Sequence, residues 1–195
     1  MVRDSAGIRI VESRGPGRWS AGEAWTAAEA VSIGVVDGPE EYTFGRIRQV
    51  AALPDGGIAV LDDTDLVIKV FDANGRHRRT FGGKGGGPAE FRGISGLALR
   101  GDTIVIHDWR LSKLAESTPD GELIRTVRAE WLTVGRGIPS GIEVVPGGLA
   151  VVVSVGCSMP PPEDRRPRWT LFTWNVEAAT VDTVLSEADP GQLGV

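Results

Sequence analysis

Short apolar stretches separated by turn residues run through most of the chain. Between residues 47 and 81, stretches rich in apolar and β-branched residues alternate with Pro54-Asp55-Gly56-Gly57 and Asp72-Ala73-Asn74-Gly75. Stretches of this length and composition predict β-strands, here at 47–53, 58–62, 67–72 and 76–81. Asp-Gly and Asn-Gly tolerate positive φ at both central positions of a two-residue hairpin, so we expect such hairpins between consecutive strands.

The same pattern recurs 46 residues further along the chain. Residues 53–62 align with residues 99–108, and Asn74-Gly75 falls on Asp120-Gly121 at the same offset. This second copy predicts strands at 94–99, 103–108, 113–117 and 123–127. A weaker third copy at residues 144–153 lacks the final aspartate and predicts strands at 142–145, 149–155, 169–174 and 180–185.

Four strands in each repeat of about 45 residues predict a β-propeller, in which every four-stranded sheet is one blade. A four-stranded sheet with both faces in water is marginal, whereas a stack of sheets buries both faces. The expected fold is therefore all-β, a partial β-propeller of about three to four four-stranded antiparallel blades. A β-sandwich with accidentally similar hairpins is the alternative.

The repeat divides the chain into segments of one propeller domain. Residues 1–46, with candidate strands at 8–12 and 31–35, are predicted to supply closing strands or a degenerate blade. Blades are predicted at 47–91, 92–136 and 137–185, and a disordered tail at 186–195. Because rings have about 4 to 8 blades, we expect either an incomplete gene product or a half-ring that self-associates through its open blade edges.

Composition and charge limit the classes of partner. Glycine and proline number 27 and 12, which fits frequent turns, and the formal net charge is −5. That charge gives no general attraction to nucleic acid or anionic lipid. No apolar stretch reaches the ~18 residues of a membrane span, and the single cysteine, Cys157, has no partner for an internal disulfide. We therefore expect neither nucleic-acid binding nor a membrane span.

Residues 42–47, 70–76 and 81–91 resemble the bacterial six-bladed β-propeller family related to NHL repeats. Those proteins often carry a Gly-x-Gly-Pro-Gly-Glu-Phe linker between blades, and residues 85–91 here read Gly-Gly-Gly-Pro-Ala-Glu-Phe. Residues 4–13 also resemble the start of the mature region that follows an export or lipoprotein signal. The resemblance extends from residue 4 to about residue 128. It implies a propeller in an exported protein, whether periplasmic, anchored to the outer membrane as a lipoprotein or secreted, and implies no activity.

One end of the predicted domain gathers the candidate ligand-binding residues. In an up-and-down blade, the turns between second and third strands share this end with the linkers between blades, and rigid blades that carry loops are a common setting for binding sites. The insertion at 156–168 belongs to the same end. The candidates are Asp62, Asp63, Asp65, Lys84, Asp108 and Arg110.

The aspartates allow two interpretations. Asp62, Asp63 and Asp65 supply the carboxylate oxygens that calcium prefers, so calcium is the one cofactor considered. However, Asp62 and Asp108 end equivalent strands, which favours carboxylates that cap turns. We assign no metal site.

Other motifs fail their chemical requirements. Lys84 in the glycine-rich stretch 82–87 is followed by glycine rather than by Ser or Thr, so this stretch is interpreted as a flexible blade linker instead of a phosphate loop. Residues 93–97 do not form a nucleophile elbow, because Leu97 replaces the last glycine. His107, in a predicted strand, is interpreted as a structural histidine. The basic stretch between Arg76 and Arg92 is interpreted as a solvated outer strand, although it would also attract an acidic ligand.

These observations favour a non-enzymatic scaffold that binds a protein, peptide or carbohydrate ligand on one loop face. The alternative is a lyase or hydrolase that acts at the central channel of the propeller. We assign no catalytic residue. The proline-rich stretch at 159–167 is interpreted as a lengthened loop, with polyproline recognition as its alternative.

Overall fold

The computed structural model describes the backbone of residues 2–5, 8–11, 26–129, 138–145, 148–155, 168–175 and 180–186, with side chains mainly over 26–129. The chain divides into two compact units, Met1–Ala30 and Val31–Val195. In the first unit, β1 (Val2–Ser5) and β2 (Ile8–Val11) form an antiparallel hairpin. The predicted tail after Ser186, residues 156–167 of the insertion and Cys157 lie outside the described residues.

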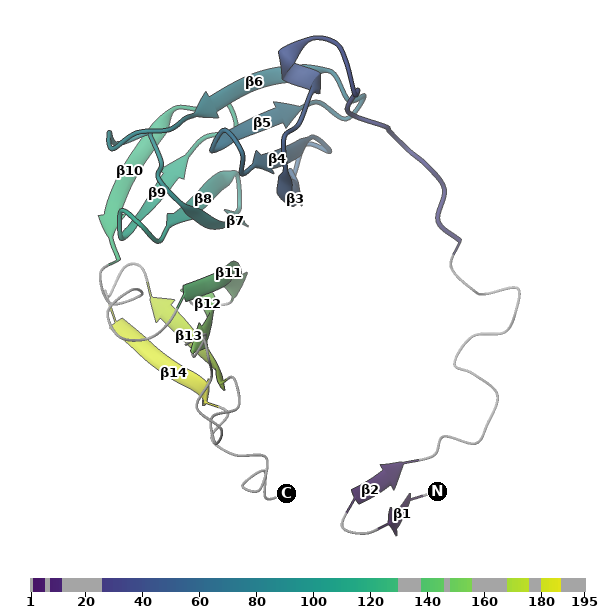
Figure 1. The fold of residues 1–195 in the computed structure, drawn as a ribbon, viewed down its shortest axis with the longest axis vertical. Helices are drawn as coiled ribbons and strands as arrows, with labels where there is room; N and C mark the ends of the chain where they lie inside the picture. Colours follow the sequence, from purple (N-terminus) through teal and green to yellow (C-terminus); the bar gives the residue numbers. More distant parts are fainter. Residues whose placement is uncertain are drawn as a thin grey trace. The chain divides into compact units, whose positions relative to one another are not determined.

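The second unit contains three four-stranded antiparallel sheets, in each of which the strands pair in chain order (Figure 1). The first sheet contains β3 (Ile47–Ala52), β4 (Ile58–Asp62), β5 (Val67–Phe71) and β6 (His77–Gly82). The second contains β7 (Ile94–Arg100), β8 (Thr103–Asp108), β9 (Lys113–Ser117) and β10 (Leu123–Arg128). The third contains β11 (Ile138–Val145), β12 (Gly148–Val155), β13 (Arg168–Asn175) and β14 (Thr180–Ser186). The predicted bounds are correct to one residue, except that β11 begins at Ile138 rather than at residue 142.

The first two sheets share one apolar core. β-Branched and other apolar side chains from both sheets are at most 1% exposed and belong to a single cluster: Ala59, Leu61, Ile68, Val70, Ile94, Leu97, Ile104, Ile106 and Ala115. Alternation along each strand places these residues on one face, so each sheet shields the other from water. β7 also lies next to both β3 and β11, which makes the first strands of the three sheets neighbours. The chain therefore has a β-propeller fold, and the sandwich alternative is wrong.

Polar side chains join the first strands of the first two sheets. The side-chain amide of Gln49 on β3 donates to the Leu97 carbonyl at 2.6 Å and accepts from the Leu97 N–H at 2.9 Å. One residue earlier, Arg48 Nε donates to the Ser95 carbonyl at 3.1 Å. These bonds satisfy backbone groups of β7 that would otherwise be buried without partners.

The hairpin turns differ from the predicted two-residue form. Gly75 has φ 76°, whereas Asn74, the residue before it, does not have a positive φ. Asp72 N–H donates to the Arg76 carbonyl, so the loop contains three residues rather than two. The Asp72 carboxylate also accepts from the Asn74 and Arg76 N–H groups at 2.9 Å each, which favours this wider turn. The prediction of positive φ at both positions is therefore wrong.

The segment before β3 covers the other face of the first sheet. The Lys69 ammonium donates to the carbonyls of Glu40 and Thr43 at 2.7 and 2.6 Å and lies 5.0 Å from the centre of the Phe44 ring. The rings of Tyr42 and Phe44 lie about 6 Å from that of Phe71. This cover consists of loop and one 3-10 turn, Glu40–Tyr42, and it keeps Lys69 buried with its charge solvated by carbonyls.

Residues 31–35 form no strand, contrary to prediction. A strand requires a hydrogen-bonded neighbour, and the described residues provide none along this stretch beyond the bond from the Val35 N–H to the Tyr42 carbonyl. Val31 and Ile33 nevertheless lie over Gly75, as Phe81 of β6 lies over the equivalent Gly121. The stretch thus packs on the first sheet in the way that β6 packs on the second.

The shared core predicts unequal effects of one substitution at two sites. Ile68 on β5 is 0% exposed within the core, whereas Ile124 on β10 is 52% exposed. We expect Ile68→Ala to lower the free energy of unfolding by about 2–5 kcal/mol, because it leaves a cavity between the sheets. The matched Ile124→Ala change is expected to lower it by less than about 1 kcal/mol. Urea denaturation measures both, and equal losses would contradict a core shared by the two sheets.

Candidate functional site

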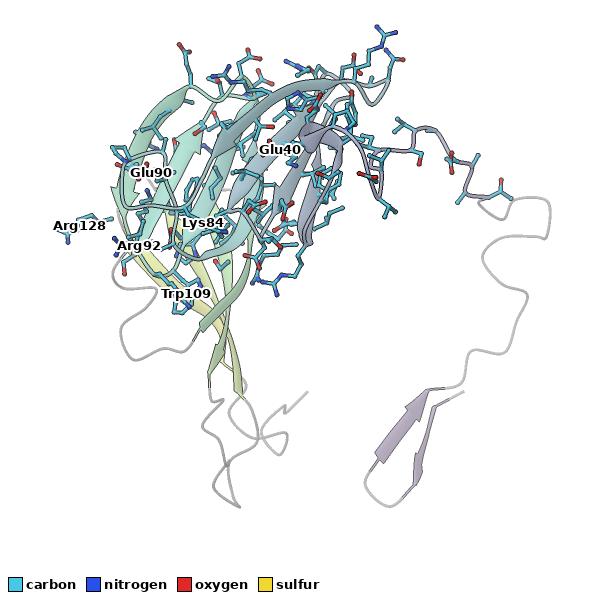
Figure 2. All side chains as sticks on the ribbon, turned by 45° about the horizontal axis from the view of Figure 1, so that its top comes forward. Glu40, Lys84, Glu90, Arg92, Trp109 and Arg128 are labelled. Carbon is cyan, nitrogen blue, oxygen red and sulfur yellow. The ribbon has the colours of Figure 1, made fainter. Side chains whose placement is uncertain are left out.

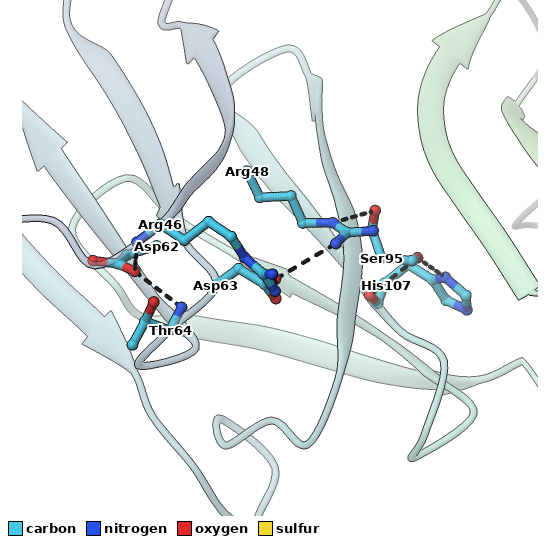
Figure 3. Close-up of polar contacts among 7 residues, drawn as sticks. All are labelled: Arg46, Arg48, Asp62, Asp63, Thr64, Ser95 and His107. Carbon is cyan, nitrogen blue, oxygen red and sulfur yellow. Dashed lines mark hydrogen bonds and ion pairs between the residues drawn. The ribbon is translucent and has the colours of Figure 1, made fainter.

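Two equivalent buried aspartates hold the loops at one end of the sheets. Asp62 ends β4, and its carboxylate accepts from the Gly45 N–H at 2.9 Å. The same carboxylate accepts from the N–H groups of Arg46 and Thr64 at 3.1 and 3.0 Å (Figure 3). Asp108 ends β8, and its carboxylate accepts from the N–H groups of Arg92, Arg110 and Leu111 at 2.6–2.9 Å. Each carboxylate thereby joins the chain entering a sheet to the turn between the second and third strands. The hydrogen bonds confirm the turn-capping interpretation.

These caps stabilise strained turns. Leu66 and Ser112 occupy equivalent positions in the two turns and have φ 58° and 50°, a region unfavourable for residues other than glycine. Burial acts to raise the pKa of the Asp62 carboxyl. The backbone N–H donors, together with the charge of Lys69, outweigh burial and hold that pKa below its ordinary value. At neutral pH the carboxylate is ionised and makes strong hydrogen bonds with the turn.

Hydrogen bonds within the glycine-rich linker and from the next sheet hold this loop. The Glu90 carboxylate accepts from the N–H groups of Gly86 and Gly87 at 3.0 and 2.9 Å. From the next sheet, the Lys113 ammonium donates to the carbonyls of Gly87 and Glu90 at 2.8 and 2.6 Å, and Phe91 is buried in the core. Because the N–H groups of Gly86 and Gly87 already have an acceptor, they are not available to bind a phosphate. This agrees with the mismatch between residues 82–87 and a phosphate-loop motif.

Between these loops lies a pocket of about 620 Å³. The chain entering β3, the β4–β5 turn, the linker before β7 and the β8–β9 turn each contribute to its wall. Figure 2 shows Lys84, Arg92 and Trp109 of this wall on the same side of the first two sheets. Its charged side chains are Arg46, Arg48, Lys84, Arg92, Arg110 and Asp63. The predicted common end of the domain is therefore confirmed for the described loops.

The pocket carries a local excess of positive charge in a chain whose net charge is −5. Asp63 pairs with Arg46 and with Arg48, the latter at 3.5 Å. Lys84 lies 3.4 Å from the carboxylate of Asp65. Among the described residues, the guanidinium groups of Arg92 and Arg110 have no carboxylate partner, and that of Arg110 lies 5.0 Å from the centre of the Trp109 ring.

The six predicted site residues fall into two groups. Asp63, Lys84 and Arg110 line the pocket. Asp65 is not part of the wall but forms an ion pair with Lys84. Asp62 and Asp108 are at most 1% exposed, so they position the pocket loops without lining them.

The predicted basic stretch divides between the two ends of the sheets. Arg78 pairs with Asp55 at 2.5 Å, at the end opposite the pocket. Lys84 and Arg92 point to the pocket instead. The solvated-strand interpretation therefore holds for the exposed Arg76 and Arg79, whereas Arg78 pairs with Asp55 and Asp120.

Arg46, Arg48 and Trp109 line the pocket but were not among the predicted site residues, and Arg92 was included only in the basic stretch that would attract an acidic ligand. Arg46 and Arg92 stand 46 residues apart, at the same offset as Asp62 and Asp108, so the repeat contained a signal for both. Nothing in the sequence pattern singles out Arg48 or Trp109.

The aspartates of the calcium hypothesis are engaged with other groups. Asp62 accepts backbone N–H groups, Asp63 pairs with arginines and Asp65 pairs with Lys84. Within the part of the chain that the structure describes, no three His, Cys, Asp or Glu residues are grouped as a metal ion would require.

His107 is a buried structural residue. Its Nδ1 lies 2.6 Å from the Ser95 hydroxyl, and the side chain is 0% exposed (Figure 3). Burial lowers the pKa of His107 to about 4, against the opposing effect of the Asp108 charge. The imidazole is therefore neutral at physiological pH. Neither His107 nor Asp108 is accessible to a ligand.

Solved structures of low sequence identity resemble this chain. A predicted exported protein of Bacteroides fragilis NCTC 9343 matches with a TM-score of 0.57 at 14% identity, over 80% of this chain and 42% of that one. A chain of the nidogen/laminin complex matches with a TM-score of 0.49 at 18% identity, over 70% of this chain and 46% of that one. The Cps50 (Swd1) β-propeller domain of Myceliophteria thermophila matches with a TM-score of 0.43 at 16% identity, over 76% of this chain and 42% of that one.

The chain spans less than half the length of these structures. At these identities the likeness concerns the fold alone. No protein-family model matches the sequence, and no curated protein matches it. Among the described residues, no helix has the length and apolar character needed to cross a membrane.

Burial of His107 predicts a specific loss of stability in acid. The unfolded chain binds a proton on this residue below about pH 6.5, whereas the folded protein resists protonation until about pH 4. Stability is therefore fully present above pH 6.5 and falls by roughly 3 kcal/mol as the pH drops to about 4. The free energy of unfolding, measured by urea denaturation across this range, should show this slope in the wild type.

His107→Gln removes the titrating group and should flatten the slope between pH 6.5 and 4. The chain contains only one other histidine, His77, which is partly exposed on β6 and provides the matched control. His77→Gln is expected to keep the wild-type slope. Identical slopes in the two variants would contradict a buried neutral His107.

Proposed function

We propose that this chain is a non-enzymatic β-propeller scaffold that binds a protein, peptide or carbohydrate ligand on its loop face. The ligand would enter the pocket between the first two sheets. The single observation that carries the proposal is the 620 Å³ hollow whose wall comes from four separate loops. Pockets of this volume, with convergent polar groups on a rigid frame, are the usual setting for ligand binding.

The rigidity of the loops supports a binding role. Asp62 and Asp108 fix the turns, while Glu90 and Lys113 fix the linker, before any ligand arrives. A preorganised site loses less conformational entropy on binding. The burial of His107 and Asp108 removes the most obvious acid–base pair from contact with a ligand, which favours binding over chemistry at these residues.

The resemblance to exported six-bladed propellers related to NHL repeats extends the proposal. We propose that the protein works outside the cytoplasm, and the likeness to a predicted exported protein supports this setting. Self-association through open blade edges is also part of the proposal. Ile47 and Val50 on β3 are 50% and 54% exposed, which supports contact with a further apolar surface.

A pocket-filling variant tests the proposed function. Thr64 is exposed on the pocket wall, so Thr64→Trp should obstruct the hollow. The matched control, Asn74→Trp, places the same side chain in the β5–β6 turn at the opposite end of the sheets. Binding of the whole chain to arrayed polysaccharides and peptides is measured by fluorescence.

We expect the wild type and Asn74→Trp to bind the same probes and Thr64→Trp to lose them. Unchanged binding by Thr64→Trp, or equal loss by both variants, would count against a ligand site in this pocket. Circular dichroism of both variants verifies that their sheets are intact.

A further inference from the structure

The charges of the pocket specify the chemistry of its ligand. Resting on the proposed function, we propose that the pocket binds an acidic oligosaccharide, whose carboxylate or sulfate groups pair with the guanidinium groups of Arg92 and Arg110. Five cationic side chains and one carboxylate line this hollow, and the carboxylate, Asp63, is already shared by Arg46 and Arg48. Within the part of the chain that the structure describes, the uncompensated charge is therefore concentrated at Arg92 and Arg110.

Backbone geometry brings these two arginines together with an indole ring. Gly93 follows Arg92, and a Cβ at this position would lie 2.8 Å from Trp109 Nε1 and from Arg110 Cγ. The glycine therefore lets Trp109 and Arg110 lie directly against the chain next to Arg92. The Asp108 carboxylate fixes the same junction, because it accepts from the backbone N–H groups of both arginines.

Guanidinium groups in this setting select oxyanions. A guanidinium presents a planar set of N–H donors that matches two oxygens of a carboxylate or sulfate, and such charge-assisted hydrogen bonds are stronger than neutral ones. Lys84 adds a further cation on the linker side of the pocket, beside its 3.4 Å contact with Asp65.

The indole ring in the wall favours a saccharide over an acidic peptide. Arginine and lysine side chains donate hydrogen bonds to the carboxylate or sulfate oxygens of either ligand, so the charged groups alone do not separate the two classes. Trp109, half-buried in the wall, adds an apolar surface suited to the C–H face of a sugar ring.

Isothermal titration calorimetry of the whole chain tests this specificity with four probes. They are trigalacturonate, its fully methyl-esterified form, a sulfated galactose trisaccharide and tetraglutamate. The ester keeps the rings and removes the charge, and the sulfated sugar separates sulfate from carboxylate as the source of the oxyanion. We expect at least one acidic saccharide to bind, the ester to bind at least about tenfold more weakly, and affinity to fall with added salt.

Charge-matched variants locate the binding. Arg92→Ala and Arg110→Ala should each weaken binding of the acidic saccharide by about tenfold or more, because each removes a charge-assisted pair. Arg79→Ala removes the same charge from the exposed side of β6, outside the pocket, and should leave the affinity within about twofold of wild type. Arg92→Lys keeps the charge without the planar fork and should fall between the two.

Four results would overturn the proposal: equal binding of acid and ester, tighter binding of tetraglutamate than of either acidic sugar, equal loss in Arg79→Ala and Arg92→Ala, or no binding of an acidic saccharide. The Thr64→Trp variant then separates this proposal from the proposed function. If another ligand binds the wild type and not Thr64→Trp, the pocket is a binding site with different chemistry. If no ligand distinguishes them, both proposals fail.

Discussion

The apolar layer between the β3–β6 and β7–β10 sheets determines how the rest of this region is built. Each sheet has too few strands to bury its own side chains, and the alternation of residues along β4 and β8 directs half of them toward the neighbour. Ile68 and Ile104 become fully buried only because the two sheets lie face to face. The loops at the ends of these strands consequently stand at fixed positions, and the pocket forms where they meet.

Buried polar groups extend this order from the core to the pocket. Asp62 and Asp108 stand at the last position of a core strand, and each binds backbone N–H groups on both sides of a loop junction. Their full burial is tolerated because backbone N–H groups donate hydrogen bonds to both carboxylates. Gln49 performs a related task by completing the backbone hydrogen bonds of Leu97 across the two first strands. Functional side chains such as Arg92 and Arg110 are thereby carried on backbone that is already fixed.

Local pattern was sufficient to predict the strands, since turn residues and β-branched stretches recur at a constant offset and each strand is a short, self-contained unit. The β8 bounds follow directly from residues 103–108. Pattern was insufficient for residues 31–35, because their apolar character satisfies packing over Gly75 without any neighbouring strand. For the site, the repeat indicated Asp62 and Asp108 but did not indicate that both side chains are buried. Trp109 enters the pocket beside Arg110 in the β8–β9 turn, whose end of the sheet the repeat indicated. Arg48 instead contacts Ser95 across the two sheets, which no local spacing encodes.

Native-state amide hydrogen exchange measures the coupling between the two sheets most directly. If the shared core holds them as one cooperative unit, amides of β4 and β5 and amides of β8 and β9 should exchange through a single opening with the same free energy and the same dependence on denaturant. Exchange of one sheet at a clearly lower free energy, while the other stays protected, would contradict a common core and leave the pocket without its rigid frame.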